Sequence, residues 1–522
     1  MSVRRVMGSE TEYGVSRRGG QYENHAQLSF DVIESVRAQN PDISHVAWNY
    51  GHEDPVHDAR GYHMQRAHVS SDLLTDREEL RATNAPQTNG ARIYVDHCHP
   101  EYSSPEVLSP REALLYNRAG DFLMKSALER AHDAEHSLIL YRNNVDGKGA
   151  SWGSHENYQI SRHVPFDALA TLFTAHAVSR QIYTGSGRVG IGEKSDHAGF
   201  QLSQRADYFK MKIGLQTTFD RPIVNTRDES HSTDEYRRFH VIVGDANRMD
   251  VPELLKMGTT SLLLWALERS YDSHSHEGTA DFLDSITLAD PVHAMHTVSH
   301  DLTLSKTFAL SSGENLTAFQ LQLRLRAWIY AVAAVEYGTD SRGEPLWPDD
   351  DTLQVVTLWT QVLEDIVHVA HSSDDERLQL SAPASRLEWL LKWQICESMR
   401  RRKNVDWSSP LVQAIDISWA RLDNSSVWLK VQSKAQHLIT DKECAHAAIN
   451  PPESTRAYTR GQLLRTYAHH VKSISWDIAV LDVDGQHILI DLTNPCEHAR
   501  QHSADTFTAQ LNIEEVVSRL KE

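Results

Sequence analysis

The chain has 522 residues and a mass of 59.1 kDa, which is more than one compact domain usually holds. Its 40% apolar and 24% charged residues are ordinary for a globular protein and exclude a disordered, collagen-like or low-complexity chain. With 71 Asp and Glu against 52 Lys and Arg, the net charge of −19 argues against nucleic acid or an anionic membrane as the main partner.

Cysteine usage and hydropathy indicate a cytoplasmic protein. The four cysteines are Cys98, Cys396, Cys444 and Cys496, and they form no CxxC pair, which is typical of a reducing compartment. No apolar signal sequence follows the first residues. The most apolar stretch, residues 261–268, is far shorter than the ~20 residues that a membrane span needs.

The first half of the chain predicts strands that alternate with helices. A strand is expected at 4–16 and a helix around 27–38, whereas the polar residues 41–90, broken by Pro and Gly, predict a long mobile loop. The elements expected next, in order, are a strand at 91–104, a helix at 111–132, strands at 137–144 and 155–162, and a helix at 166–183.

The second half is richer in helix. It predicts strands at 221–229 and 237–247, a helix at 251–272, a largely helical region at 316–403, and a last unit with strands at 475–483 and 486–492 between helices. We therefore expect an α+β protein with a mainly antiparallel sheet. A domain at 1–439, with an insertion at about 41–82, precedes a small domain at 440–522.

Acidic and histidine side chains recur on the predicted strands. Glu10 and Glu12 stand at i and i+2, so both carboxylates leave the same face of a strand. A single such pair is usually just solvated, but further strands carry Asp96 with Glu101, His155, and His240. Oxygen ligands with occasional histidine suit Mg²⁺, whereas no Cys/His set has zinc spacing.

Several arginines are candidate phosphate ligands, because a guanidinium matches phosphate oxygens with two parallel hydrogen bonds. They are Arg205, Arg227, Arg237, Arg238, Arg456 and Arg460, and any one alone is more often a surface or ion-pair residue. The GxGxxG run at 185–190 follows a predicted helix instead of a strand, so we interpret it as a glycine-rich turn beside the site. The chain has no Walker A, GxSxG or HExxH motif.

Eight sequence blocks together resemble the Dop family of depupylases and Pup deamidases in order and spacing. They are MGSETEYG, NGARIYVDHCHPEYSSPE, YRNNVDGKGASWGSHENY, SRQIYTGSGRVGIG, FQLSQRADY, IVNTRDESH, YRRFHVIVGDAN and PPESTRAYTRG. Pup ligases share part of this pattern, and both groups belong to the glutamine-synthetase-like carboxylate–amine ligases. The polar insertion with WNYGHEDPVHDARG resembles one that Dop has and the ligase lacks.

The resemblance implies a glutamine-synthetase-like curved, mainly antiparallel sheet packed with helices, and a small C-terminal α/β domain that closes the nucleotide site. It implies ATP as a bound cofactor with Mg²⁺, and Pup and pupylated proteins as partners. The implied reaction is hydrolysis of the isopeptide bond between Pup and a substrate lysine, and deamidation of a C-terminal Gln of Pup.

The resemblance also implies roles for individual residues. Mg²⁺ is expected at Glu10, Tyr94 and Glu101, with Glu12, His155 and His240 as further ligands, and Asp96 is expected to act as nucleophile or general base. ATP is expected at Arg92, Ser104 and Trp476, with Arg205, Arg227, Arg456 and Arg460 on phosphates. Pup is acidic, so we expect a local basic groove that includes Arg237, Arg238, Arg400 and Arg401.

Three alternatives stay open. A Pup–protein ligase would use the same site for ATP-driven conjugation, a small-molecule glutamate–amine ligase would need a closed pocket, and a nucleotide-binding adaptor would show no turnover. Cys98 stands two residues from Asp96, where the family is expected to have a small residue, and Ser230 replaces an expected proline.

Overall fold

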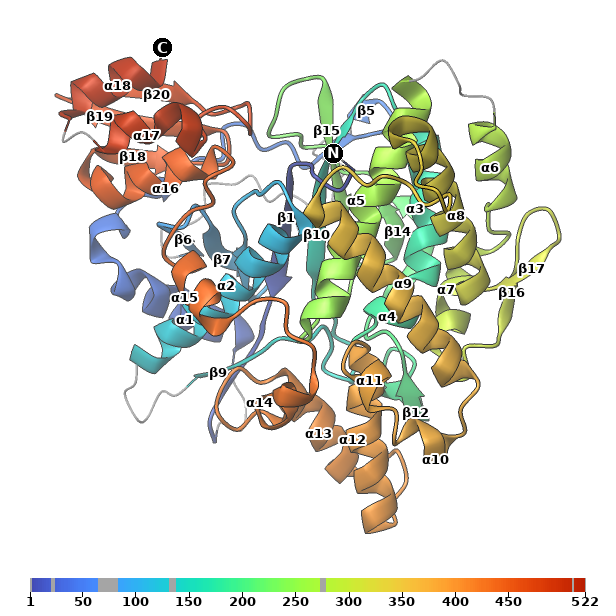
Figure 1. Ribbon diagram of the computed structural model, residues 1–522. Helices are drawn as coiled ribbons and strands as arrows, with labels where there is room; N and C mark the ends of the chain where they lie inside the picture. The colour runs from blue at the N-terminus through green and yellow to red at the C-terminus, as the bar shows by residue number, and fades with distance from the viewer. Residues whose placement is uncertain are drawn as a thin grey trace.

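The computed structural model describes residues 2–19, 24–63, 83–130, 138–272, 278–508 and 511–521. A six-stranded sheet, antiparallel throughout, forms its centre (Figure 1). Its strands in spatial order are β15 (Tyr236–Val241), β10 (Ser154–Ser161), β1 (Met7–Glu12), β8 (His99–Ser103), β7 (Arg92–Asp96) and β6 (Asn84–Pro86). The expected α+β class with an antiparallel sheet is confirmed.

The two faces of this sheet differ in character because side chains alternate along each strand. One face packs on α2 (Pro110–Arg130) and α5 (Asp250–Asp272). There Asn117 of α2 donates a hydrogen bond to Ser9 at 2.8 Å, and Glu156 of β10 is buried against Arg180. The opposite face carries the acids and histidines of the predicted site.

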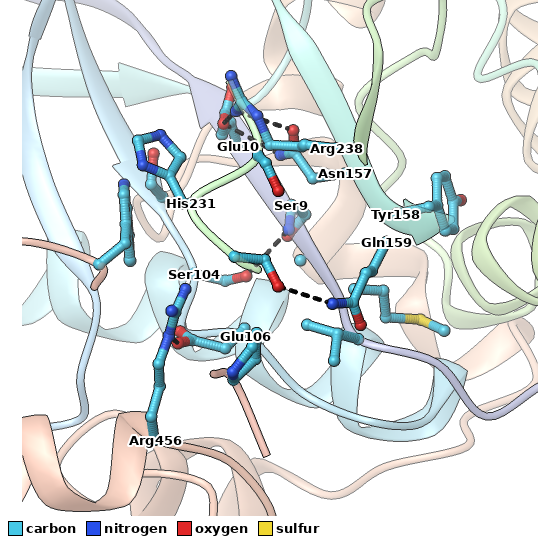
Figure 2. Close-up of a pocket in the computed structure, with 18 of the residues that line it drawn as sticks. Ser9, Glu10, Ser104, Glu106, Asn157, Tyr158, Gln159, His231, Arg238 and Arg456 are labelled. Atoms are coloured by element: carbon cyan, nitrogen blue, oxygen red, sulfur yellow. Dashed lines mark hydrogen bonds and ion pairs between the residues drawn. The ribbon is translucent and has the colours of Figure 1, made fainter. Parts of the chain in front are cut away.

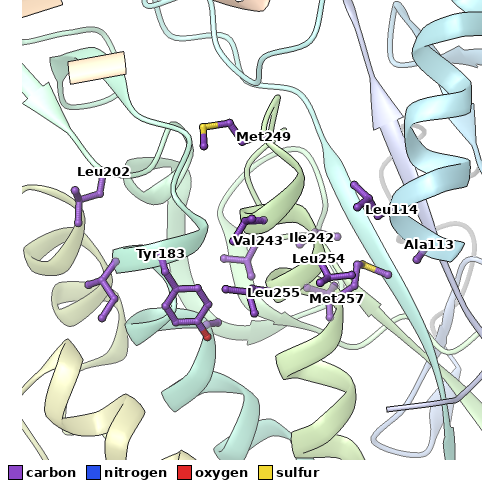
Figure 3. Close-up of a cluster of buried hydrophobic side chains, with 14 of the residues drawn as sticks. Ala113, Leu114, Tyr183, Leu202, Ile242, Val243, Met249, Leu254, Leu255 and Met257 are labelled. Carbon is purple, nitrogen blue, oxygen red and sulfur yellow. The ribbon is translucent and has the colours of Figure 1, made fainter. Parts of the chain in front are cut away.

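A layer of helices covers the apolar face (Figure 1). Its members besides α2 and α5 are α3 (Phe166–Ser179), α4 (Gln181–Thr184), α6 (Thr279–Ser285), α7 (Pro291–Ser299), α8 (Ala318–Tyr337) and α9 (Asp350–Ala370). Helix α5 is buried along most of its length, and a Cβ at Gly258 would lie 2.5 Å from Val355 of α9. Figure 3 shows this core, with Leu254, Leu255 and Met257 of α5 gathered near Tyr183 and Ile242.

The remaining helices of the large core pack on α2, on α9, on the central sheet or on one another. They are α1 (His25–Gln39), α10 (Asp374–Arg377), α11 (Ser381–Ala384), α12 (Glu388–Lys403), α13 (Pro410–Ala420), α14 (Val427–Val431) and α15 (Asp441–Ala447). Buried Glu388 begins α12 and accepts hydrogen bonds from the backbone of Arg248 and Met249 and from the indole of Trp419. This carboxylate thereby fixes α12 and α13 to the segment after β15.

Short strands complete the large unit. They pair as β2 (Gly14–Arg17) with β9 (Leu138–Tyr141), β4 (His57–Asp58) with β5 (Tyr62–His63), β11 (Arg188–Ile191) with β12 (His197–Gln201), β13 (Phe209–Gly214) with β14 (Arg221–Asn225), and β16 (Thr307–Ala309) with β17 (Asn315–Thr317). Short 3-10 turns lie at Pro41–Ile43, Ala206–Tyr208, Gln432–Lys434 and Ala468–His470. None of the described helices is long and apolar enough to cross a membrane.

The C-terminal unit has a separate apolar core. It contains α16 (Ala457–Thr466), β18 (Val471–Ile474), β19 (Ile478–Val483), β20 (Gln486–Asp491), α17 (Arg500–Thr508) and α18 (Ile513–Lys521). Its sheet is completed by β3 (Ala47–Trp48) from the insertion, which pairs parallel to β18. Ile43, Val46 and Trp48 belong to this core, whereas Cys444 and Ala447 of α15 pack in the large one. The small core therefore includes insertion residues and excludes α15, unlike the predicted 440–522 unit.

Two segments differ from the expected secondary structure. Residues 91–104 form the hairpin β7–β8 instead of one strand, and its two-residue turn places His97 at φ 42° and Cys98 at φ 73°. Residues 41–63 contain short strands instead of a structureless loop. Strand β3 pairs with β18, β4 and β5 pair with each other, and Asp58 forms a bridge to Arg227. Of the rest of the predicted loop at 41–90, residues 64–82 lie outside the described residues, and residues 83–90 contain strand β6 instead of loop alone.

Candidate active site

A cavity of about 720 Å³ lies over the polar face of the central sheet. Alternate residues of five neighbouring strands point into it, because i and i+2 side chains share a face. They are Glu10 and Glu12 of β1, His155 of β10, His240 and Arg238 of β15, His99, Glu101 and Ser103 of β8, and Arg92, Tyr94 and Asp96 of β7. The structure therefore brings together the carboxylates and histidines that the sequence singled out.

Glu10, His155 and His240 form one cluster whose candidate ligand atoms lie within 4.8 Å of one another. Glu10 lies opposite His155 in the β1–β10 register, with Oε2 3.0 Å from its Nδ1, and it accepts a hydrogen bond from Asn157 at 3.0 Å. Burial alone would raise the pKa of Glu10, but the hydrogen bond with His155 and the charges of His240, His155 and Arg238 hold it well below its usual value.

Glu12, Asp96 and Glu101 form a second cluster of the same size. Glu101 is 1% exposed, and its Oε1 accepts no hydrogen bond from the described part of the chain. Burial and the neighbouring charges of Asp96, Glu10 and Glu12 raise its pKa well above the usual value. A buried oxygen with no donor among three acids is an environment that a hard divalent cation would stabilise.

Asp96 ends β7 at the hairpin turn. Its Oδ2 lies 2.9 Å from Nδ1 of His97, which the left-handed turn directs back toward the strand. Burial would raise the pKa of Asp96, but the hydrogen bond and charge of His97, with the charges of His155 and Arg227, lower it instead. The site therefore holds one carboxylate ionised beside another whose negative charge is disfavoured.

A smaller cavity of about 100 Å³ adjoins the first at the start of β1 (Figure 2). Ser104 lines it, and its Oγ accepts a hydrogen bond from the backbone of Ser9 at 3.0 Å. Both cavities are lined by Glu10, Ser103, His231, Arg238 and Trp476. The indole of Trp476 therefore lies where the smaller cavity, whose walls are mostly apolar, opens into the larger cavity near Glu10.

The family of the chain follows from the sequence comparison. Residues 5–480 match the family described as Pup-ligase protein. The chain belongs to the Pup-ligase protein family. The Pup deamidase/depupylase of Mycolicibacterium smegmatis is 38% identical over 99% of this chain and 100% of that protein, and the depupylase of Acidothermus cellulolyticus is 38% identical over 99% of both. The Pup–protein ligase of Bifidobacterium longum is 33% identical over 74% of this chain and 77% of the ligase. The expected resemblance to depupylases is confirmed.

Solved structures of this family share the fold. The ligase PafA in its complex with Pup has a TM-score of 0.75 at 24% identity, covering 99% of this chain and 93% of that one. PafA in complex with ADP has a TM-score of 0.68 at 25% identity, covering 84% of this chain and 90% of that one. The Pup-ligase family fold therefore extends over nearly the whole chain.

The insertion of this family member contributes residues that sequence reasoning missed. The guanidinium of Arg92 lies over the ring of Trp48 at 4.3 Å and over Tyr94 at 4.0 Å, and Glu53 lies 3.6 Å from it. The hydroxyl of Tyr50 accepts a hydrogen bond from Arg92 at 3.1 Å. Aromatic residues in an otherwise polar loop, WNYGHED, were the signal that could have identified them.

Buried Asp58 fixes the second part of the insertion to the large unit. It accepts hydrogen bonds from Thr226 at 2.7 Å and from Arg60 at 2.8 and 2.9 Å. The backbone amide of Ala59 also donates to Thr226 at 2.8 Å, next to Arg227 on the cavity wall. The described part of the insertion is thereby attached at two places, to β18 of the C-terminal unit and to the segment after β14.

The predicted arginines fall into three places. Arg205, Arg227 and Arg238 line the larger cavity, and Arg237 and Arg456 line the smaller one. The side chain of Arg460 contacts Glu106 and the carbonyl oxygen of Trp476 and lines neither cavity. At the end of α12, Arg400 and Arg401 pair with Glu397, and they line neither cavity.

The glycine-rich run begins directly after α4 and continues into β11, so a helix precedes it as expected. Gly187 and Gly190 have φ of 71° and 92°, which favours glycine, and a Cβ at Gly187 would lie 2.6 Å from Phe200. Glu193, just beyond this turn, lines the larger cavity. The run itself lines neither cavity, and it lacks the strand-to-helix context of a dinucleotide-binding motif.

Proposed function

We propose that this enzyme is a depupylase and Pup deamidase, which hydrolyses the side-chain amide of the C-terminal residue of Pup. The observation that carries the proposal is the carboxylate of Asp96, which lies 2.9 Å from Nδ1 of His97 and clusters with Glu12 and Glu101 on the wall of a polar cavity. Water adds to the side-chain carbonyl, the C–N bond breaks, and the leaving lysine amine or ammonia takes up a proton. The full-length likeness to depupylases supports this reading.

Asp96 would act on the carbonyl either by direct attack or by accepting a proton from water. Both roles need an ionised carboxylate at neutral pH. His97 favours that state by hydrogen-bonding Asp96 from the adjoining turn. The hairpin geometry also limits the freedom of Asp96, because its strand pairs with β8 up to His99.

Mg²⁺ fits both clusters of candidate ligands. Glu10, His155 and His240 would hold one ion, and Glu12 and Glu101 would hold another next to Asp96, with Tyr94 on the neighbouring strand position. The unsatisfied buried oxygen of Glu101 supports this assignment. When bound, Mg²⁺ would polarise the carbonyl and offset developing negative charge.

ATP would bind as a cofactor with its base in the smaller cavity and its phosphates toward Glu10. Trp476 would stack on adenine, Ser104 would line the same pocket, and Arg92, Arg227 and Arg238 would face the phosphates from the larger cavity. Arg456 and Arg460 would act indirectly, because both hold Glu106 and so attach the C-terminal unit that carries Trp476. That unit would thereby close the nucleotide site.

Pup is the proposed protein partner, and its acidic surface would be met by basic side chains. Arg237 and Arg238 lie at the cavities, whereas Arg400 and Arg401 form a separate exposed group at the end of α12. Association with Pup should weaken as salt rises. Salt-independent affinity would instead favour apolar anchoring of an amphipathic Pup helix.

The test is incubation of the full chain with a pupylated protein, Mg²⁺ and ATP, in parallel with Asp96→Asn. Release of free Pup by the wild-type chain alone is the expected result. ATP-driven attachment of Pup to lysine, without release, would show that the enzyme is a ligase.

A further inference from the structure

Among the described residues, six lysines and arginines line the larger cavity, and four of them have a carboxylate within 4 Å. These pairs are Arg92 with Glu53 at 3.6 Å, Lys210 with Glu193 at 2.6 Å, Arg227 with Glu229 at 3.8 Å, and Arg238 with Glu229 at 3.1 Å. Arg205 and Arg221 have no such partner anywhere in the described ranges. Of the cavity-lining cations that the structure describes, these two guanidinium groups therefore lack a carboxylate partner.

Arg205 and Arg221 converge on one residue. The Nε of Arg205 donates to the hydroxyl of Ser151 at 3.4 Å, and the Nη2 of Arg221 donates to the carbonyl oxygen of Ser151 at 2.9 Å. Their other bonds go to the carbonyl oxygens of Ile242 and Thr217. Within the described part of the chain, Nη2 of Arg205 and Nη1 of Arg221 donate to no acceptor. Two nitrogens that can donate to the same ligand are therefore available.

Burial makes these charges costly. The side chain of Arg205 is 1% exposed, and burial together with the charge of Arg221 lowers its pKa to about 9. Burial lowers the pKa of Arg221 as well. The carboxylate of Glu12 attracts both groups, but it belongs to the acidic cluster next to Asp96. An anion supplied from outside the chain would satisfy both arginines.

We propose that Arg205 and Arg221 form the subsite for the free α-carboxylate of the residue whose side-chain amide is cleaved. This inference rests on the proposed function. Because the scissile bond is made by the side chain, the substrate residue keeps an ionised α-carboxylate a few bonds away. The acids Glu12, Asp96 and Glu101 would repel that charge, so a cationic pair beyond Glu12 is needed to hold it.

The subsite would give selectivity for a chain terminus. An internal Gln or Glu side chain has a neutral peptide carbonyl where the C-terminal residue has a carboxylate. Binding of such an internal residue would displace water from Arg205 and Arg221 and give them no counter-charge, so its binding free energy would be less favourable. The enzyme would therefore reject ordinary glutamines and isopeptides at internal positions.

The experiment uses the full chain with Pup ending in Gln, synthesised with a C-terminal α-carboxylate or with an α-carboxamide. Ammonia release from the side chain is measured with Mg²⁺ and ATP. For the wild-type chain we expect the α-carboxamide to raise KM roughly ten- to hundredfold with little change in kcat, since the lost contact is remote from the reacting carbonyl. Equal kinetics for the two forms would overturn the subsite.

Variants assign the effect to the arginines. In Arg221→Met the two forms of Pup should become equivalent, and Arg221→Lys should keep part of the preference through its charge. Lys210→Met is the matched control, because it removes a cavity cation that already pairs with Glu193, and the preference should persist. A preference that is unchanged in Arg221→Met would refute the assignment.

Inorganic phosphate and direct binding separate the remaining explanations. If the two arginines instead hold free phosphate, added phosphate should change the rate of ammonia release by the wild type but not by Arg221→Met. Both chains should then still distinguish the two forms of Pup, and that result would overturn the proposal. Binding of labelled Pup to Asp96→Asn tests the subsite without turnover. Preference in binding without cleavage by the wild type would support the subsite and refute the proposed function.

Discussion

The contact between Glu106 and two arginines of the C-terminal unit gives a quantitative prediction. Oε1 of Glu106 accepts from Arg456 at 2.6 Å and Arg460 at 3.0 Å, and Oε2 accepts from Arg460 at 2.5 Å. Burial would raise the pKa of Glu106, but the charges of Arg460 and Arg456 lower it to about 2 from 4.5. At about 1.36 kcal/mol per pKa unit, this difference is on the order of 3 kcal/mol.

Glu106→Gln keeps the shape of the side chain and removes its charge. It leaves two buried guanidinium groups without their counter-charge, a change that typically costs about 3–5 kcal/mol. We expect the C-terminal unit to detach more easily, so that hydrogen exchange in α16 accelerates roughly a hundredfold or more. Deuterium uptake of peptides from residues 457–466 is the measurement.

Glu443→Gln is the matched control. Glu443 also has a pKa lowered to about 2, chiefly by its hydrogen bond from Arg111 at 2.6 Å, but its side chain is 38% exposed. Solvent screens this pair, so its loss should cost about 1 kcal/mol or less. Equal effects of the two substitutions, or unchanged exchange in α16 of Glu106→Gln, would refute the role of the buried contact.

The same contact predicts a dependence on pH. Because the folded pKa of Glu106 lies below the unfolded value, its contribution is complete above about 4.5 and is lost as pH falls toward about 2. The wild-type chain should therefore lose protection of α16 between these values. Glu106→Gln, which has no such proton to gain, should show a smaller change across that interval.

Four further predictions concern the site and the insertion. Asp96→Asn should lower release of free Pup by about 10²- to 10⁴-fold while Pup still binds, because the substitution removes a proton acceptor or nucleophile and little volume; residual activity near wild type in the Pup-release assay would contradict its role. Trp476→Ala should weaken ATP binding by about 1–3 kcal/mol in calorimetry, with Trp476→Phe close to wild type, as expected for loss of stacking on a base. Glu12→Gln should raise the Mg²⁺ concentration needed for half-maximal activity by about tenfold or more, because an anionic oxygen ligand is lost; an unchanged Mg²⁺ titration would exclude Glu12 as a ligand. Asp58→Ala should destabilise the docked insertion by about 1–3 kcal/mol, which would be measured as faster hydrogen exchange at 47–63. The control is Asp54→Ala, which removes an exposed pair with His63 and should have little effect.

Much of the site was predictable because strand geometry has a period of two. Once a strand at 4–16 was assumed, Glu10 and Glu12 had to share a face, and the same holds for Tyr94 and Asp96. Which strands are neighbours depends instead on pairing between distant segments, such as Glu10 with His155. Periodicity carries no information on such pairs, so the two separate acidic clusters were not predictable from the residues alone.

The errors at 91–104 and 41–63 have different physical origins. The hairpin turn uses His97 and Cys98 at positive φ, where Gly or Asn would have been the sequence signal, so nothing in DHCH indicated a reversal. Residues 47–48 form a strand only because β18 supplies its partner about 425 positions later. Two-residue strands have no detectable period. The first part of the insertion therefore takes its structure from the C-terminal unit. Its Trp48 and Glu53 contact Arg92, and so they connect the packing of that unit to the cavity wall.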